Sequence, residues 1–466
     1  MSNSYSLEST TFGLIFKKIV KEKDNPVRFD YEIQVHTVED DLPVKKLLSF
    51  DLVRDYVGHI CERGAIRFKM SMGQYIKKLY PFRTNLEVTV KEFELKEQGF
   101  ERKEGKKPKI TRYKAIFNQD ENLNVAASGY ENLSIEHLDN ADFTDVTLQL
   151  TDRSAEPLRI ITVSGTYNNK TYEDLMRALL NNESIQVLVD GKPSIDGVDI
   201  VKPDNTTVNK QTLIPSGMLL RNVPTFFQEQ CEGVYSTSIG TFLQTYKEKK
   251  YWFVYPLQRF KRFEENDPKM IFYAIPKDRY QDIDRTYKVE GDITQVLIAD
   301  DRRYVDQADL VNMNEGNGLR AVDAYPMMHK PALTTGKGPV AQRTHLNSEV
   351  TFNDRPDGLN YSPVIDGKIT FNRYYEYSRV VGRNTGTAEV IWKNCNPEQI
   401  YPGMPCKFIT MGKIKPIERK GIIQYFHMLT SAETEGFGPS AYRRTMKIVI
   451  SLEAFDKDDT SEKTLK

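Results

Sequence analysis

Hydrophobic and polar residues alternate along most of the first 155 residues, the pattern of half-buried β-strands. The alternation predicts strands over residues 27–38, 65–72, 86–95, 113–117 and 145–150. Residues 73–80 instead carry apolar side chains at helical spacing, and Pro81 ends that run. Strands interrupted by a short helix predict a small β-barrel with helical insertions, and we assign it to residues 1–156.

A polar segment between Leu95 and Ile110 separates two of these strands. It mixes charges of both signs with glycines and Pro108, which predicts a hairpin tip that reaches into solvent. A tip that docks onto a partner is the alternative, and the residues alone leave it open.

The pattern changes at about residue 157 to a mixture of helical and strand periodicity. It predicts helices over residues 172–180, 224–231 and 238–246, and a strand over residues 251–257. Thr171 supplies an N-cap, Asn181 and Asn182 a stop, and Pro224 a first helical turn. We therefore expect an α+β intermediate domain over residues 157–285.

Residues 286–466 are expected to form a second β-rich domain. It begins near Lys288 with a strand or a helix and continues with a polar stretch over residues 300–366, which is too long for a structureless loop. We expect an inserted subdomain or arm there. Strands are predicted over residues 369–373, 387–392, 402–410, 421–429 and 443–453. The polar tail over residues 455–466 should fray.

Size and composition agree with several soluble domains of mainly β structure with α+β portions. A chain of 466 residues exceeds what one hydrophobic core usually serves. Hydrophobic residues make up 39% and charged residues 28%, and the 25 Tyr and 23 Phe favour strands and interfaces.

Net charge argues against a dedicated nucleic-acid binder, because 65 Lys and Arg are matched by 65 Asp and Glu. The opening residues lack the basic and apolar segments of a signal peptide, and no later run approaches 18 apolar residues. We expect a protein made in a cytoplasm, without a membrane anchor.

The sequence contains no motif from which a catalytic, cofactor-binding or metal-binding residue can be proposed. Four cysteines lie far apart and predict buried free thiols: Cys61, Cys231, Cys395 and Cys406. Six histidines lie in unrelated surroundings: His36, His59, His137, His329, His345 and His427. Residues 333–339 and 382–390 fail as phosphate-binding and pyrophosphate-binding loops. We expect no enzyme and no cofactor, although sequence alone does not exclude a pair of carboxylates for sugar hydrolysis.

Several segments in one order carry a resemblance to a known family. They are LTTGKG from Leu333, RYYEYSRVV, AEVIWKN, YPGMPCKF from Tyr401, GIIQYFHML, and YRRTMKIVISLEA from Tyr442. In this order the chain resembles the central baseplate hub proteins of contractile-tailed bacteriophages, a family shared with the hub half of secretion-system spike proteins. More loosely, GAIRFKMSMGQYIKKLYPFRTNLEVTV and SGTYNNKTYEDLMRALL resemble its first barrel and intermediate domain.

The resemblance implies two tail-tube-like β-barrel domains joined by an α+β region and an inserted subdomain. It implies a homotrimeric hub that adapts a sixfold tail tube to a trimeric central spike, as a structural virion protein of the tail baseplate assembled in the host cytoplasm. DNA would pass through its channel without specific binding.

The partners implied are the chain itself, the central spike protein and the tail-tube or tube-initiator proteins. The tape measure protein and the baseplate wedge are further candidates. Two alternatives remain open: another baseplate or tube-initiator component, and a tail-associated cell-wall hydrolase.

Overall fold

Strands dominate the computed structural model. It describes residues 11–22, 25–117, 143–265, 268–275, 277–281, 283–299, 303–306, 319–323, 348–352, 386–411, 416–434 and 440–453. The fold is mainly β, as predicted, with few and short helices. None of the helices within these ranges is long and apolar enough to cross a membrane.

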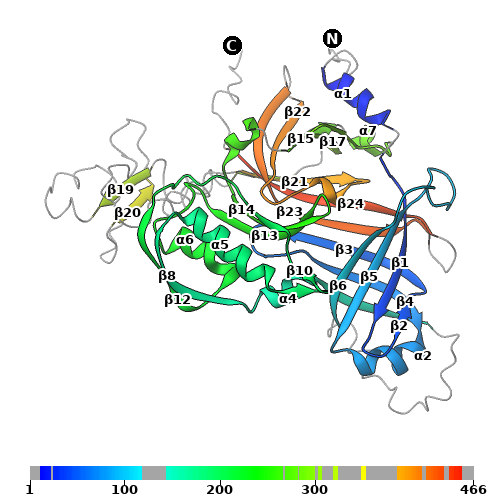
Figure 1. The fold of residues 1–466 in the computed structure, drawn as a ribbon. Coiled ribbons are helices and arrows are strands. Elements are labelled where there is room, and N and C mark those ends of the chain that lie inside the picture. The colour runs from blue at the N-terminus through cyan, green and yellow to red at the C-terminus, as the bar shows by residue number, and fades with distance from the viewer. Residues whose placement is uncertain are drawn as a thin grey trace, which may run out of the picture.

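Eight antiparallel strands pair in a closed ring, which we call the first ring (Figure 1). In the order of pairing they are β23 (Pro416–Ala432), β3 (Lys46–Asp55), β4 (Arg63–Ser71), β7 (Phe143–Asp152), β6 (Lys109–Phe117), β5 (Leu86–Glu94), β1 (Phe29–His36) and β24 (Tyr442–Leu452). The short β2 (Asp41–Pro43) pairs with β1. Strands near the two ends of the chain therefore share one sheet.

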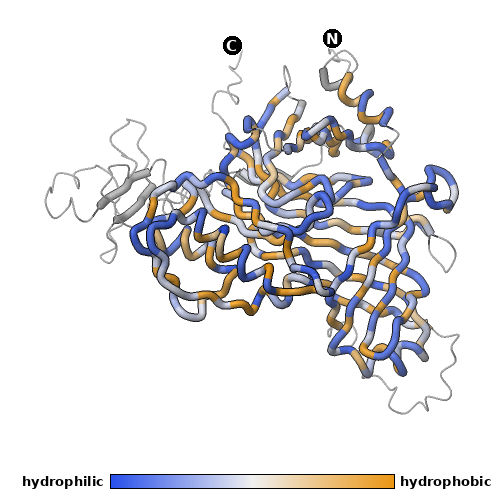
Figure 2. Tube along the Cα trace, in the orientation of Figure 1, coloured by the Kyte–Doolittle hydropathy of each residue, from blue (hydrophilic) through white to orange (hydrophobic). Residues whose placement is uncertain are grey.

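Alternation of apolar and polar residues explains why these strands form. Inward positions such as Ile66, Phe68 and Met70 of β4 are fully buried, while Arg67 between them is exposed. Figure 2 shows the same alternation of hydrophobic and hydrophilic residues along the strands. Between β4 and β5 the chain makes α2 (Met72–Gln74), η2 (Tyr75–Leu79) and η3 (Tyr80–Phe82), where the short helix was predicted.

A second group of strands uses the same β23–β24 hairpin from its other side. Beyond β23 lie β22 (Pro405–Met411), β15 (Lys269–Ile275), β17 (Ile293–Ala299) and β16 (Tyr287–Glu290), and beyond β24 lie β21 (Gly386–Lys393) and β18 (Arg303–Asp306). β17 approaches β21 without a strand pairing, and Thr286 beside it donates its hydroxyl to the Lys393 carbonyl. The long hairpin is thus common to two neighbouring β units.

The first ring has a narrow seam between β1 and β24, where only Phe29 and Tyr442 pair. Arg444 of β24 reinforces it from inside: its guanidinium forms an ion pair with Glu92 of β5 and donates to the Tyr31 hydroxyl at 2.6 Å. It also lies 3.6 Å from the centroid of the Phe29 ring. Burial disfavours the charge, but Glu92 and Tyr31 outweigh it and raise the pKa of Arg444.

An α+β lobe lies beside the two β units. Its elements are α4 (Ala155–Leu158), β8 (Thr162–Lys170), α5 (Tyr172–Ile185), β9 (Leu188–Val189), β10 (Lys192–Pro193), β11 (Gly197–Ile200), β12 (Asn209–Leu219), η6 (Leu220–Asn222), α6 (Val223–Glu229), β13 (Ile239–Tyr246), β14 (Lys249–Pro256) and η7 (Phe260–Glu264). β11, β14 and β13 form a three-stranded sheet, and β8 pairs with β12 in a separate ribbon. The helices α5 and α6 share an apolar core with these strands.

The predicted helix over residues 238–246 is wrong, because this segment is strand β13. The adjacent β13 residues Phe242 and Leu243 are buried in two different cores. Phe242 belongs to the core of the large sheet, and Leu243 belongs to the core of the lobe. A strand that is buried on both faces lacks the alternation of apolar and polar residues from which a strand is predicted. Its turn is also atypical: Lys247 and Glu248 both have positive φ, with Tyr246 opposite Lys249, the geometry of a two-residue primed turn that usually contains Asn or Gly.

Helix α5 begins as predicted, but Asn181 and Asn182 do not stop it. The Thr171 hydroxyl accepts a hydrogen bond from the Asp174 amide, and the Asp174 carboxylate accepts one from the Thr171 amide, which completes a capping box. The helix continues to Ile185 because Ser184 is buried against Trp252 and accepts its indole N–H at 2.9 Å. Tertiary packing outweighs the weak helix propensity of asparagine here.

The remaining predicted strands are confirmed wherever the structure describes them. β22 starts at Pro405 rather than at Pro402, which lies in the preceding turn. The predicted strand at 369–373, the polar tail and most of the predicted insert at 300–366 lie outside the described residues; within the insert, β19 (Leu319–Asp323) pairs with β20 (Ser348–Phe352). The predicted domain boundaries at residues 156 and 285 stay a prediction. Strand β15, which lies within the predicted intermediate domain, pairs with β22 in the large sheet.

Two more elements complete the described chain. Helix α1 (Thr11–Val20) places Ile19 in a small core with side chains of β15 and β17, and α7 (Lys277–Gln281) adds Tyr280 to the same core. η9 (Pro397–Gln399) lies in the connection from β21 to β22. The N-terminal helix therefore covers the second group of strands.

Candidate functional site at the junction of rings and lobe

A buried polar network joins the first ring to the segment before β22. Arg54 of β3 donates to Glu62 at 2.7 Å and to the Pro397 carbonyl at 3.1 Å, and Tyr113 of β6 donates to the other Glu62 oxygen at 2.8 Å. Burial opposes the charge of Arg54, but the Glu62 carboxylate prevails and raises the pKa of the guanidinium. The ion pair is satisfied on both sides, as a buried pair must be to persist.

The same network continues into the lobe. Tyr56 donates to Gln244 of β13 at 3.0 Å, and the Gln244 amide donates to the Ile400 carbonyl at 2.7 Å. Tyr255 of β14 donates its hydroxyl to the Tyr56 carbonyl at 2.7 Å. These bonds tie the lobe, the first ring and the segment before β22 into one body.

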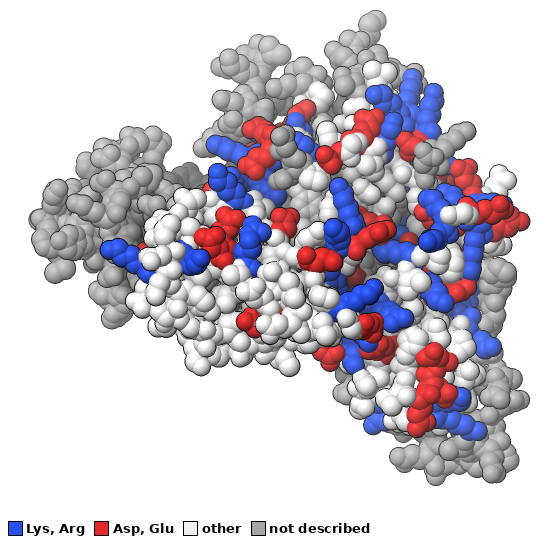
Figure 3. Space-filling model, viewed as in Figure 1, with Lys and Arg blue, Asp and Glu red and all other residues white. Residues whose placement is uncertain are grey.

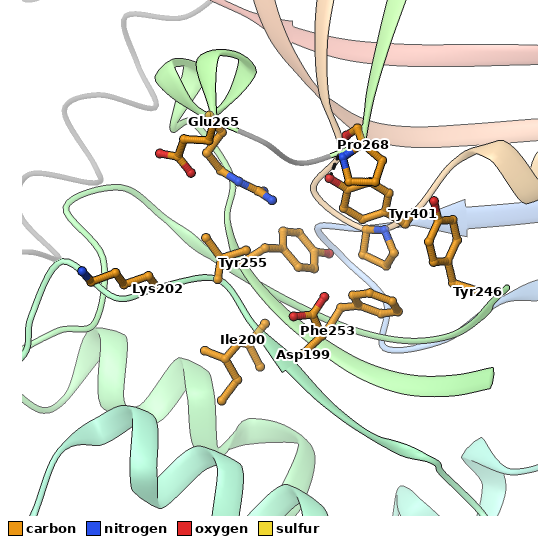
Figure 4. Close-up of a pocket in the computed structure, with 13 residues that line it drawn as sticks. Asp199, Ile200, Lys202, Tyr246, Phe253, Tyr255, Glu265, Pro268 and Tyr401 are labelled. Atoms are coloured by element: carbon orange, nitrogen blue, oxygen red, sulfur yellow. Dashed lines mark hydrogen bonds between the residues drawn. The ribbon is translucent and has the colours of Figure 1, made fainter. Parts of the chain in front are cut away.

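A pocket of about 320 Å³ opens at this junction (Figure 4). Its walls come from β11 and the residues after it, from the ends of β13 and β14, from η7, and from the turn before β22. The deep lining is aromatic, with Phe253 at 5% exposure and Tyr401 at 6%. Figure 4 shows Tyr246, Phe253 and Tyr401 on one side and Lys202 and Glu265 on the other.

Ring contacts hold the aromatic side of the pocket. The Tyr401 centroid lies 5.5 Å from that of Tyr246 and 6.3 Å from that of Phe253. Tyr401 also donates its hydroxyl to the Pro268 carbonyl at 3.0 Å. Burial raises the pKa of Tyr246, so its phenol stays neutral. The pocket therefore has aromatic side chains along one side, charged residues at its rim and the buried Arg262 in its lining.

Gly403 shapes the pocket through the turn predicted at Tyr401–Gly403. Its φ of 66° suits glycine, and a β-carbon added there would lie 2.3 Å from Tyr255. The backbone carbonyl of Gly403 accepts a hydrogen bond from Arg262 of η7 at 2.7 Å. The glycine in YPGMPCKF therefore lets the turn before β22 approach Tyr255 of β14 closely.

The three histidines that the structure describes each lie against an aspartate, which the sequence did not reveal. His36 contacts Asp41 at 2.6 Å through Nδ1 and the Thr89 hydroxyl at 2.7 Å through Nε2. This order of groups is that of a nucleophile, a base and an orienting acid. Thr89, however, is only 5% exposed, so the arrangement suits a brace between strands β1 and β5 rather than a nucleophile that a substrate can reach.

The other two described histidines are simpler pairs. His59 contacts Asp55 at 2.8 Å, and His427 of β23 contacts Asp51 of β3 at 3.3 Å. His137, His329 and His345 lie outside the described residues. No group of His, Cys, Asp and Glu that could hold a metal occurs in the described part of the chain.

All four cysteines are free thiols, and three are buried. Burial raises the pKa of Cys231 to about 11 and that of Cys395 to about 12. Cys61 receives a hydrogen bond from Arg159 at 3.3 Å. Such thiols are poor nucleophiles at neutral pH.

The loop between β5 and β6, which the sequence predicts as a hairpin tip in solvent, is held by several ion pairs. Glu94 pairs with Lys106 at 2.7 Å, Lys96 pairs with Glu101 at 2.7 Å, and Arg102 pairs with Asp30 at 2.6 Å. Phe100 stands among these charges at 48% exposure. Figure 3 shows acidic and basic side chains interspersed over the ring region and few of them over the face of the lobe.

The family-like segments that the structure describes converge on the shared hairpin. AEVIWKN forms β21, YPGMPCKF leads into β22, GIIQYFHML lies in β23, and YRRTMKIVISLEA forms β24. LTTGKG and RYYEYSRVV lie outside the described residues. The described segments are all neighbours in one sheet.

No protein-family model matches the chain, and no curated protein matches its sequence. Among solved structures it is similar to the tail protein from Neisseria meningitidis MC58, with 9% identity, 90% of this chain and 96% of that chain covered, and a TM-score of 0.44. It is similar to the 43 kDa tail protein of prophage MuSo2 from Shewanella oneidensis, with 10% identity, 90% and 98% coverage, and a TM-score of 0.41.

A third similar structure is the E. coli c3393 protein. It is described as a component of the type VI secretion system with structural similarity to the T4 bacteriophage tail proteins gp27 and gp5. Identity is 10%, coverage is 91% of this chain and 77% of that chain, and the TM-score is 0.40. The chain is thus similar to tail and secretion-system proteins over most of its length, at low identity.

Proposed function

We propose that this chain is the central hub of a contractile-tail baseplate, a structural virion protein that forms a homotrimer. Each subunit would contribute two β-barrels of the tail-tube type, so that three subunits present six barrels to the sixfold tube and threefold symmetry to the central spike. DNA would pass through the central channel of the trimer without specific binding. The proposal assigns the chain an assembly role and no catalysis.

One observation carries the proposal: the described family-like segments all lie in or beside the hairpin that two neighbouring β units share. A hub of this kind needs two such units held rigidly side by side, and a common hairpin supplies this. The buried network around Arg54 and Gln244 adds a fixed lobe to the same body.

Partners follow from the proposed position. The chain would contact its own copies, the central spike protein and a tail-tube or tube-initiator protein, with the tape measure protein and the baseplate wedge as further partners. Equal numbers of acidic and basic residues suit a conduit through which DNA must slide. Obligate assemblies of this kind typically bury more than about 2,000 Å².

The test is reconstitution of the purified chain with a candidate spike protein, followed by imaging of the complex. The hub predicts a threefold ring that caps the spike. A sixfold ring without spike binding would instead indicate a tube initiator. A monomer that degrades cell-wall substrate in a gel would indicate the hydrolase.

A further inference from the structure

The second group of strands is closed on one side by side chains instead of a strand ladder. Strand β21 pairs with β24 along its whole length on one edge, but on its other edge β18 reaches only as far as Glu389. Beyond Glu389 this edge faces Tyr280 of α7 and residues 283–287, which together we call the closing segment. β17 lies beside β21 here, and the described residues of these two strands do not pair.

Two hydroxyl groups of the closing segment satisfy the main chain of β21. Tyr280 accepts a hydrogen bond from the Lys393 amide at 2.7 Å and donates to the Ile391 carbonyl at 3.3 Å. Thr286 donates to the Lys393 carbonyl at 2.5 Å and accepts the Trp392 indole N–H at 3.0 Å. Tyr280 and Thr286 are each only 1% exposed, so loss of either hydroxyl would leave buried polar groups without a partner. Closure of this edge therefore depends on two side chains.

Helix α1 and the residues after it, as far as Asn25, contact this closing segment, and we call them the N-terminal clamp. Ile19 of α1 is fully buried in a small core with Tyr280 and Ile283, and this core is separate from the core of the large sheet. Leu14 of the same helix is 60% exposed, so α1 is attached through one face only. Figure 1 shows α1 beside α7 and β17.

Polar contacts fix the end of the clamp to residues at the end of the closing segment. Arg285 donates to the Glu22 carbonyl, and the Lys288 ammonium lies 3.8 Å from the Glu22 carboxylate. Asn25 donates its side-chain amide to the Tyr287 carbonyl at 2.5 Å. The clamp thus contacts the closing segment at its start through the small core and at its end through these polar contacts.

We infer that the N-terminal clamp controls a seam between β17 and β21 at which the second group of strands opens. The docked clamp holds Tyr280 and Thr286 against β21. Release of the clamp removes the support of both ends of the closing segment, and the edge of β21 beyond Glu389 becomes accessible. Local opening needs the fewest broken contacts here, because two hydroxyl groups and a small core replace a ladder. The inference does not depend on the proposed hub function.

The first experiment measures hydrogen exchange of the Lys393 amide in the full chain, by mass spectrometry at residue resolution. Ile19→Ala should raise this exchange rate at least about 10-fold, because it loosens the small core that positions Tyr280. Leu14→Ala, on the exposed face of the same helix, is the matched control and should leave the rate unchanged. The Trp392 amide points to the opposite edge of β21, toward β24, and should keep its wild-type rate in both variants.

The second experiment asks whether the clamp acts through the Tyr280 hydroxyl. Tyr280→Phe keeps the ring in the small core but removes the acceptor of the Lys393 amide, and should also raise its exchange rate at least about 10-fold. Addition of Ile19→Ala to Tyr280→Phe should then raise the rate by less than a further factor of about three. Asn25→Ala removes a contact of the clamp outside the small core and should also speed exchange at Lys393, which keeps the test available if Ile19→Ala does not fold.

Faster exchange at Lys393 in Ile19→Ala and in Asn25→Ala, with wild-type exchange at Trp392, supports the clamp. Wild-type exchange at Lys393 in either variant contradicts it. Equally faster exchange at Trp392 would show that the whole sheet is destabilised, and would also overturn the inference. Effects of Ile19→Ala and Tyr280→Phe that multiply in the double variant would show that α1 and the hydroxyl act independently, which again rules out the clamp.

Discussion

At the β1–β24 seam we expect one buried residue, Arg444, to contribute more to the stability of the first ring than its exposed neighbour Arg443. Arg444 is buried and paired with Glu92, whereas its neighbour Arg443 lies at the surface and pairs with Glu433 and Asp284. Removal of one partner of a buried pair leaves an uncompensated charge, but removal of a surface partner leaves a solvated one. Adjacent arginines on one strand should therefore differ strongly.

We predict that Arg444→Ala lowers the free energy of unfolding by about 3–5 kcal/mol. Arg443→Ala is the control and should lower it by less than about 1 kcal/mol. Urea titration followed by circular dichroism measures both. Equal small effects would contradict the role given to Arg444 at the seam.

Gly403 provides a second residue-scale prediction. Gly403→Ala should lower the free energy of unfolding by about 3 kcal/mol, because the residue has a positive φ and its β-carbon would overlap the Tyr255 side chain. Gly191 has a similar φ of 74° with nothing near its β-carbon position, so Gly191→Ala should cost only about 1 kcal/mol. Calorimetry of the two variants separates steric overlap from backbone strain.

At the scale of elements, the hairpin between β13 and β14 closes with an unfavourable sequence. Lys247 and Glu248 both occupy left-handed backbone conformations that Asn and Gly adopt more easily. The double substitution Lys247→Asn with Glu248→Gly should raise the free energy of unfolding by about 1 kcal/mol. A destabilised double variant in thermal unfolding would show that the native side chains contribute contacts of their own.

The elements also show what a sequence can predict. Strands with one face in solvent, such as β1, β5 and β24, are predictable from their alternation of apolar and polar residues. Helix α5 is predictable from its helical spacing and from Thr171 as N-cap. The sequence did not predict strand β13, because both of its faces are buried and the turn that follows it lacks Asn and Gly. The sequence did not predict the junction pocket for a different reason: β11, the β14–η7 segment and the turn at Tyr401 are far apart in sequence, and only the fold brings them together.

At the scale of the whole molecule, ring and lobe should behave as one cooperative body. Tyr56, which follows β3, donates to Gln244 of the lobe, and Tyr255 of the lobe donates to the Tyr56 carbonyl. Arg54 and Gln244 both donate to carbonyls of the segment before β22. We predict a single calorimetric transition for wild type. Arg54→Ala should broaden it, because the ring then loses one of its buried ties to the segment before β22 while the lobe keeps its own core.

The mass of the purified chain in solution, alone and with a candidate spike protein, tests whether the chain assembles as a hub. A homotrimeric hub has a mass of three times 53.8 kDa, and addition of the spike should stabilise this trimer. A hexamer, or a monomer that does not respond to the spike, would contradict it.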